Sequence, residues 1–137
     1  SGASGLIPEA WHWSYLRHGA PQLNGRFERL HSRRMNSKDW SAWIAVKTLI
    51  ESVIRTKSKN NLELIDFILS EKLQLDGSKG ISLNYRSVTN QLRQTILLTS
   101  SNNWVTSIVP LSEFQNSNNN LDTLGIPSDE TICKEGS

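Results

Sequence analysis

Hydrophobic residues recur at helical spacing in three stretches of the first half of the chain. The strongest stretch, residues 38–55, carries a wide apolar face whose members fall three or four positions apart. Weaker patterns of the same period predict helices over residues 21–34 and 61–72. A face as wide as that of residues 38–55 is expected to be buried against more than one neighbour. Its members are Trp40, Trp43, Ile44, Val46, Leu49, Ile50, Val53 and Ile54.

The period of the pattern changes in the second half of the chain from that of a helix to that of a strand. Apolar and polar residues alternate at 81–85, and apolar runs near 94–99 and 104–109 predict two further strands. The polar residues between the last two runs predict a hairpin turn. Residues 111–137, rich in Asn, Ser and Asp, are expected to form an irregular tail that packs on the same domain. The order of these elements predicts an α/β fold.

The predicted strands offer little apolar surface to the long helix at 38–55. Hydrophobic residues make up only 36% of the chain, which is below the usual content of soluble domains. The helix therefore needs more apolar partner surface than the chain supplies. We expect residues 1–110 to belong to a domain that is not self-contained.

Charge narrows the classes of function. The 15 basic and 13 acidic residues give a net charge of +2, which is too mild to indicate nucleic-acid binding. Fourteen of the 15 basic residues lie in residues 1–100, so a basic body precedes an acidic tail. Such a distribution suits either an anionic ligand or a solvated surface. Because no run of about 18 apolar residues is present, no direct membrane insertion is expected.

Catalytic and metal sites are not expected. His12, His18 and His31 are spaced so that no two of them fall on adjacent turns of one helix, as a His-x-x-x-His pair would. No serine lies in a Gly-x-Ser-x-Gly turn. Cys133, the single cysteine, lies in the acidic tail, where no cation would stabilise a thiolate. We therefore predict no enzyme activity, no metal site and no cofactor.

The segment PEAWHWSYLRHGAP, residues 8–21, is dense in large amphipathic side chains. Its candidate ligand-binding residues are Trp11, His12, Trp13 and Arg17. Aromatic faces can stack on a flat ligand, and an arginine can form a forked pair with a carboxylate. The same tryptophans are equally suited to packing in a core, so both interpretations stay open.

A second candidate site lies at the start of the predicted helix 38–55. Lys38, Asp39 and Trp40 stand at a helix N-terminus, which attracts anions. The alternative is a capping turn followed by a buried tryptophan. The nearby stretch RFERLHSRR could bind an anionic polymer through its arginines, or it could be a solvated helix face.

Six stretches, taken in their order along the chain, resemble the last third of type I periplasmic solute-binding proteins, the branched-chain amino acid-binding class of ABC transporters. They read GLIPEAW, LNGRFERLHSRR, WSAWIAVKTLIESVIR, NNLELIDFILSEKLQLDGSKGISLNY, NQLRQTILL and NWVTSIVP. A narrower likeness, carried by AWHW, RHGAPQLNGRF, DWSAWIAVK, LDGSKGISL and NLDTLGIP, is to the subfamily associated with pyrroloquinoline quinone (PQQ)-dependent alcohol dehydrogenase systems.

The resemblance implies a fold, a site and a function. It implies a partial type I fold, because members of the family carry a first lobe and most of a second before this part. It places residues 8–21 and 38–40 beside the cleft between the lobes. The implied function is noncatalytic binding of a small solute in the periplasm and its delivery to an ABC permease. The solute would be pyrroloquinoline quinone, an amino acid or another small acid.

Two other functions are compatible with the sequence. The chain could be a sensor or accessory subunit of the alcohol-oxidation system that does not transport. It could also be a small interaction domain that binds an anionic polymer through its arginines. Salt-dependent binding to oligonucleotides would favour that last function.

Overall fold

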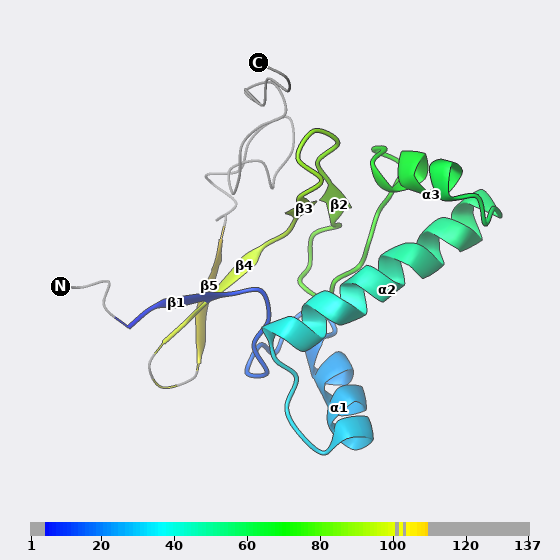
Figure 1. Ribbon diagram of the computed structural model, residues 1–137. Coiled ribbons are helices and arrows are strands. Elements are labelled where there is room, and N and C mark those ends of the chain that lie inside the picture. Colours follow the sequence, from blue (N-terminus) through cyan, green and yellow to red (C-terminus); the bar gives the residue numbers. More distant parts are fainter. Residues whose placement is uncertain (1–4, 101, 103, 110–137) are drawn as a thin grey trace.

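The computed structural model describes residues 5–100, 102 and 104–109 (Figure 1). Three helices and two small antiparallel sheets make up this part of the chain, a mixed α/β arrangement. The predicted tail 111–137, with Cys133, lies outside the described residues. The helices are α1 (Ala20–His31), α2 (Ser37–Thr56) and α3 (Asn61–Ile68), and the strands are β1 (Ile7–Glu9), β2 (Asn84–Tyr85), β3 (Leu92–Arg93), β4 (Ile96–Thr99) and β5 (Val105–Val109).

All three predicted helices are present, and two of them are shorter than the pattern predicts. Helix α1 ends at His31 rather than at residue 34, because Ser32 takes a left-handed conformation and its N–H returns to the carbonyl of Glu28 at 2.8 Å. Helix α3 ends at Ile68 rather than at residue 72.

Helix α2 begins with a complete capping box. The side chain of Asn36 accepts hydrogen bonds from the N–H groups of Lys38 and Asp39 at 3.0 and 3.1 Å. The Asp39 carboxylate in turn accepts from the N–H of Asn36 at 3.0 Å. Two N–H groups that a helix start normally leaves unpaired are therefore satisfied, and the start of α2 is fixed.

A three-stranded sheet in the order β1-β4-β5 lies on one side of the helices (Figure 1). The predicted hairpin is confirmed, because β4 and β5 pair antiparallel with Leu97 opposite Ile108. A bulge follows Leu98 in this ladder. The hydrophobic pattern does not predict β1, whose three residues pair with β4 and bring residues 7–9 beside residues 97–99.

The predicted strand at 81–85 is largely absent. Only Asn84–Tyr85 forms a strand, which pairs with Leu92–Arg93, and Leu83 makes a single bridge with Leu75. The alternation at 81–85 nevertheless reflects burial, since Leu83 is fully buried. Short turns on both sides limit the pairing of β2 with β3 to two residue pairs. The alternating pattern at 81–85 therefore indicates a partly buried loop and not a full strand.

Glycine makes the 76–80 turn possible in two different ways. Gly80 has φ of 95°, the positive φ that we expect of a turn glycine. Gly77 instead provides space, because a Cβ there would lie 2.6 Å from a methyl carbon of Leu83 and 2.9 Å from the Trp40 ring. The indole N–H of Trp40 uses this approach and donates to the carbonyl of Gly77 at 3.0 Å.

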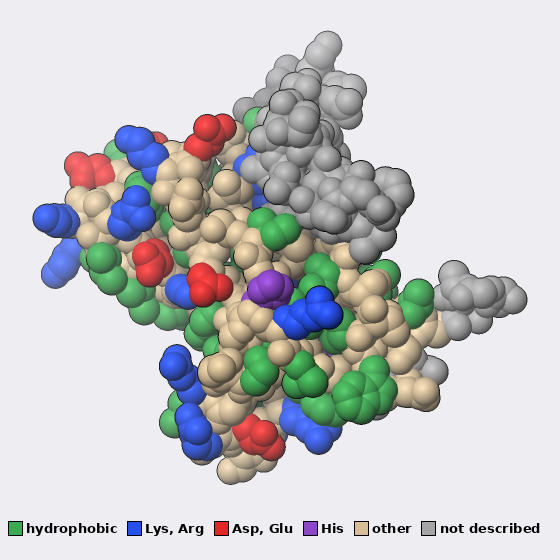
Figure 2. Space-filling model, turned by 180° about the vertical axis from the view of Figure 1, so that it is seen from behind, with side chains coloured by type: hydrophobic (Ala, Val, Ile, Leu, Met, Phe, Trp, Pro, Cys, Tyr) green, Lys and Arg blue, Asp and Glu red, His purple; other side chains and the backbone are tan. Residues whose placement is uncertain are grey.

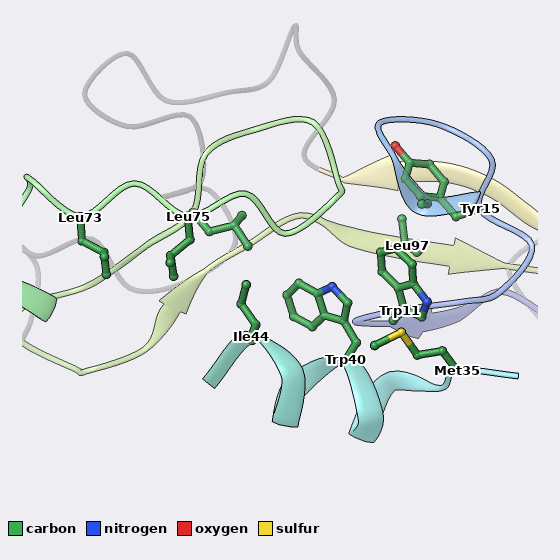
Figure 3. Close-up of a cluster of buried hydrophobic side chains, with 10 residues drawn as sticks. Trp11, Tyr15, Met35, Trp40, Ile44, Leu73, Leu75 and Leu97 are labelled. Atoms are coloured by element: carbon green, nitrogen blue, oxygen red, sulfur yellow. The ribbon is translucent and has the colours of Figure 1, made fainter. Parts of the chain in front are cut away.

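The core lies where residues 10–15, α2 and the larger sheet meet. Trp11 and Trp40 are fully buried and stack with ring planes 6° apart, and Tyr15 meets Trp11 edge-on (Figure 3). The other buried hydrophobic residues are Ala20, Met35, Ile44, Leu73, Leu75, Leu83 and Leu97.

The described residues leave much of the wide apolar face of α2 uncovered, as expected of a helix that needs more apolar partner surface than these strands offer. The helix buries Trp40, Ile44, Thr48 and Ser52, a stripe with a spacing of four residues. The opposite side carries large apolar residues that are at least half exposed. They are Val46, Leu49, Ile50 and Ile54, and α3 adds Leu62 and Ile65.

Internal hydrogen bonds explain why hydroxyl side chains can line the buried stripe. Thr48 donates to the carbonyl of Ile44, and Ser52 donates to that of Thr48, each at 2.7 Å. Because the donors are satisfied within the helix, burying these hydroxyls costs little. Their small size also lets the neighbouring chain approach α2 closely.

Candidate functional site

Residues 10–19 connect β1 to α1 and form the crossover segment. The Ser37 hydroxyl accepts from the N–H of Trp11 at 3.2 Å and donates to its carbonyl at 3.0 Å. Asn24 accepts from the indole N–H of Trp11 at 2.9 Å and donates to the carbonyl of Trp13 at 3.1 Å. The segment is therefore fixed to the start of α2 and to α1, and its side chains are held in place.

A pocket of about 420 Å³, the Trp13 pocket, opens between the crossover segment and the start of α2. It brings together four of the seven residues predicted from the sequence: Trp11, His12, Trp13 and Lys38. Glu9, Met35, Asn36 and Ser37 complete its lining. The two candidate segments, 26 positions apart at Trp11 and Ser37, thus meet at one place.

The tryptophans take different positions in this arrangement. Trp11 and Trp40 have no exposed surface to offer a ligand, and of these two only Trp11 is among the residues that line the pocket. Trp13 is half-buried, and the Arg34 guanidinium lies 3.6 Å from the centre of its ring. Such a cation over an indole face is a favourable contact that fixes the ring. Trp13 is the tryptophan of this segment that a ligand can reach.

The hydrogen bonds of His12 define its protonation. The Ser14 hydroxyl accepts from the N–H of Val105 at 3.2 Å, so its own hydrogen is free to point to His12 Nδ1, 2.7 Å away. The Ser14 N–H also donates to that nitrogen at 3.2 Å. Nδ1 is thus an acceptor, and the proton of the neutral ring is on Nε2. Burial lowers the pKa of His12, against an opposing effect of Glu9, which favours this neutral form.

The charged residues at the start of α2 have separate environments. Lys38 is exposed at the pocket. Asp39 closes the capping box and pairs with Arg33 through two contacts of 2.6 and 2.7 Å. The hydrogen bond from Arg33, aided by the Asn36 N–H, lowers the pKa of Asp39 to about 2. The Asp39 carboxylate is therefore occupied by Arg33 and the Asn36 N–H, which agrees with the interpretation of this segment as a capping turn.

Arg17 lies apart from the other predicted residues. It lines a second pocket of about 640 Å³, the Tyr15 pocket, on the side of the crossover segment that faces β5. The lining residues are Ser14, Tyr15, Leu16, Arg17, His18, Lys79, Gly80, Ile81, Thr95 and residues 104–108. The structure therefore places four of the seven predicted residues at the Trp13 pocket and Arg17 at the Tyr15 pocket, while Asp39 and Trp40 line neither.

Lys79, which the sequence does not single out, is fully buried at the edge of the Tyr15 pocket. Its ammonium donates to the carbonyls of Ala10 and Thr95 and to the side-chain oxygen of Gln94, at 2.7 to 2.9 Å. It also lies 3.9 Å from the centre of the Trp40 ring. Burial lowers the pKa of Lys79 to about 7. A lysine between turn residues gives no sequence signal for such burial.

The arginines of α1 and its flank do not form one basic surface. Arg33 pairs with Asp39 and also lies over the Phe27 ring, while Arg34 stacks on Trp13. In the face that Figure 2 shows, Lys and Arg side chains are spread over several parts and are not gathered in one stripe. On this face the basic side chains form no continuous track.

Within the residues described, no group of three or more His, Cys, Asp or Glu side chains is placed to hold a metal ion. None of the described helices is both long and apolar enough to cross a membrane. Comparisons with protein-family models, with curated proteins and with solved structures find no match for this chain. Membership of the type I class, which the motifs indicate, therefore stays a prediction.

Proposed function

We propose that this chain is the C-terminal part of a two-lobed, noncatalytic solute-binding protein of the type I periplasmic class. Its role would be to capture a small molecule in the periplasm and deliver it to an ABC permease, in a system linked to quinoprotein alcohol oxidation. The observation that carries the proposal is the convergence of two sequence-predicted segments on the Trp13 pocket. Capture would proceed by closure of the two lobes over the solute.

The chemistry of the Trp13 pocket suits reversible binding. Trp13 offers an aromatic surface, and Lys38 offers an exposed positive charge. Because Ser14 donates to Nδ1 of His12, the ring proton is on Nε2. This Nε2–H donor has no hydrogen-bond partner among the described residues. A flat acid such as pyrroloquinoline quinone could stack on Trp13, form an ion pair with Lys38 and accept a hydrogen bond from His12.

The exposed apolar residues of α2 and α3 support the same proposal. A monomeric soluble protein rarely exposes a contiguous apolar patch of this kind unless the patch contacts another surface. In a two-lobed protein the rest of the polypeptide would cover Val46, Leu49, Ile50 and Ile54. The proposal thus accounts for the site and for the uncovered side of α2.

The direct test is a calorimetric titration of the whole polypeptide that the gene encodes, with pyrroloquinoline quinone, leucine and acetate as probes. We expect one of these to bind and Trp13→Ala to weaken its binding at least about tenfold, a loss of about 1.4 kcal/mol. Trp43→Ala, at a half-buried tryptophan that lines neither pocket, is the matched control. Absence of binding by all three probes would contradict the proposal.

The reading frame upstream of Ser1 offers a second, cheaper test. A type I protein requires a first lobe and a secretory signal before this part of the chain. We expect both to be encoded there. A start codon directly before Ser1 would overturn the proposal.

A further inference from the structure

The Tyr15 pocket has a composition that the proposed solute site does not explain. It is built from four separate parts of the chain: the crossover segment, the turn at 79–81, Thr95 and residues 104–108. Its volume of about 640 Å³ falls within the range of pockets that hold small organic molecules. Neither Trp13 nor Lys38 lines it, although the Trp13 ring lies beside the ring of Trp104, which does, with centroids 6.4 Å apart.

The charged and titratable side chains of the Tyr15 pocket favour a negatively charged ligand. Arg17 and His18 are exposed at the pocket, and the Lys79 ammonium lies buried behind it. The described lining residues include no Asp or Glu. Lys79 already donates to three oxygens, so it would contribute its charge, while Arg17 has its forked donors available for a direct contact.

Two buried hydroxyl groups in this pocket have no hydrogen-bond partner among the described residues. They are the phenol oxygen of Tyr15, a residue with 4% of its surface exposed, and Oγ1 of Thr95, a residue with 1% exposed. Native proteins pair nearly all buried polar atoms, and unpaired ones commonly mark a place that a water, ion or ligand fills. Both residues line the same pocket, so one ligand there can supply both partners.

Part of the remaining wall of the pocket is apolar. Leu16, Ile81, Val105 and Ile108 contribute aliphatic side chains, and Trp104 adds an exposed indole. An inorganic anion would leave this wall without a contact. A ligand with an acidic group and a hydrophobic body would use both parts of the lining.

We propose that the Tyr15 pocket is a second binding site, for a small organic carboxylate with an apolar body. The carboxylate accepts hydrogen bonds from Arg17 and from the hydroxyls of Tyr15 and Thr95. The body of the ligand packs against Ile81, Val105 and Ile108. This site is separate from the Trp13 pocket and does not depend on transport, because every residue in it belongs to the described chain.

The test uses calorimetry on the 137-residue chain with benzoate, its neutral isostere benzamide and inorganic phosphate as probes. We expect benzoate to saturate one site with a Kd below about 1 mM. Benzamide, which lacks the charge, should bind at least about tenfold more weakly. Phosphate, which lacks the body, should also bind more weakly than benzoate. Equal binding of benzamide, equal binding of phosphate, or no saturation by benzoate would each overturn the proposal.

Three variants locate the site. Tyr15→Phe and Thr95→Val remove only the unpaired hydroxyls and keep the shape of the core, and each should weaken benzoate binding about three- to tenfold. Arg17→Gln should weaken it at least about tenfold, whereas Arg29→Gln, on the exposed side of α1, should leave it unchanged. Unchanged binding in Arg17→Gln would contradict the assignment.

One further variant separates this proposal from the solute-binding function. Lys38→Gln should leave benzoate binding to the 137-residue chain unchanged, because Lys38 lines the Trp13 pocket and not the Tyr15 pocket. If benzoate binding is lost in Lys38→Gln and kept in Arg17→Gln, the carboxylate site is the Trp13 pocket and the second site does not exist.

Discussion

The indole of Trp11 lies parallel to the indole of Trp40, with ring planes 6° apart and centroids separated by 6.2 Å. The two rings come from the crossover segment and from the first turn of α2. Each has its own hydrogen-bond acceptor, Asn24 Oδ1 for Trp11 and the Gly77 carbonyl for Trp40. This pair therefore joins the crossover segment, α1, α2 and the 76–80 turn into one body.

Removal of one ring of this pair should strongly destabilise the domain. Trp40→Ala should lower the free energy of unfolding by about 3–5 kcal/mol, since it leaves a large cavity under Trp11. Urea unfolding of the chain, followed by circular dichroism, measures the change. Trp104→Ala, at an exposed tryptophan, is the control and should change stability by less than about 0.5 kcal/mol. Equal effects of the two variants would contradict the assignment of Trp40 to the core.

The start of α2 should depend on pH in the acid range. The pKa of Asp39 is lowered to about 2 in the folded chain, below the ordinary 3.8, so its stabilising effect is complete above about pH 4 and is lost as the pH falls through 2. Asp39→Ala should cost about 1 kcal/mol at neutral pH, the usual effect of losing a cap. Stability of both proteins measured from pH 7 to about pH 2 should converge at the acid end.

The control for this prediction is Asp66→Ala, at an exposed position on α3. It should remain close to the unchanged protein over the whole pH range. A constant difference between the unchanged protein and Asp39→Ala down to pH 2 would show that the carboxylate charge has no part in the cap.

Lys79 should give a pH dependence of the same sign in a different range, above neutrality. Burial lowers its pKa to about 7 from 10.5, so between these values the unfolded chain binds more protons than the folded one. Stability should therefore rise with pH across this window, by up to about 1.4 kcal/mol per pH unit. Lys79→Met should lack the rise. Unfolding measured near pH 7 and pH 9 for both proteins gives the comparison, and parallel curves would contradict it.

Gly77 should resist even the smallest enlargement. Gly77→Ala places a Cβ within 2.6 Å of Leu83 and 2.9 Å of Trp40, both fully buried, so neither side chain can move aside freely. Overpacking of this kind typically costs about 1–3 kcal/mol. Gly25→Ala, where a Cβ meets nothing within 4 Å, is the matched control and should be neutral or stabilising. An equal loss of stability in Gly25→Ala and Gly77→Ala would contradict the conclusion that residue 77 is glycine because no space exists there for a Cβ.

Sequence patterns predicted the local features of this fold and missed those that depend on tertiary contacts. The capping turn at the start of α2 is a local feature, because the Asn36 side chain and the backbone N–H groups that it caps are neighbours in the chain. The buried position of Lys79 was not predicted, because its three acceptors lie at positions 10, 94 and 95. The Trp13 pocket was predicted in part, since aromatic density marked residues 11–13 but could not distinguish the buried Trp11 from the reachable Trp13.

Helix α2 exposes several large apolar residues and buries the hydroxyl residues Thr48 and Ser52, and this determines which substitutions the helix can accept. The hydrophobicity of a residue in α2 should therefore not indicate how much its substitution destabilises the chain. Leu49→Ser, on the exposed side, should alter the stability of the chain by less than about 0.5 kcal/mol, as is usual for a surface site. Ser52→Leu, at a fully buried site, should cost about 1–3 kcal/mol, because no room exists for the larger side chain. A substitution table ranked by hydrophobicity would place these two changes in the wrong order. The exposed apolar side of α2 is free to vary as far as this domain is concerned. The side under constraint is the buried stripe, which holds Trp40 and Ile44 as well as the hydroxyl residues Thr48 and Ser52.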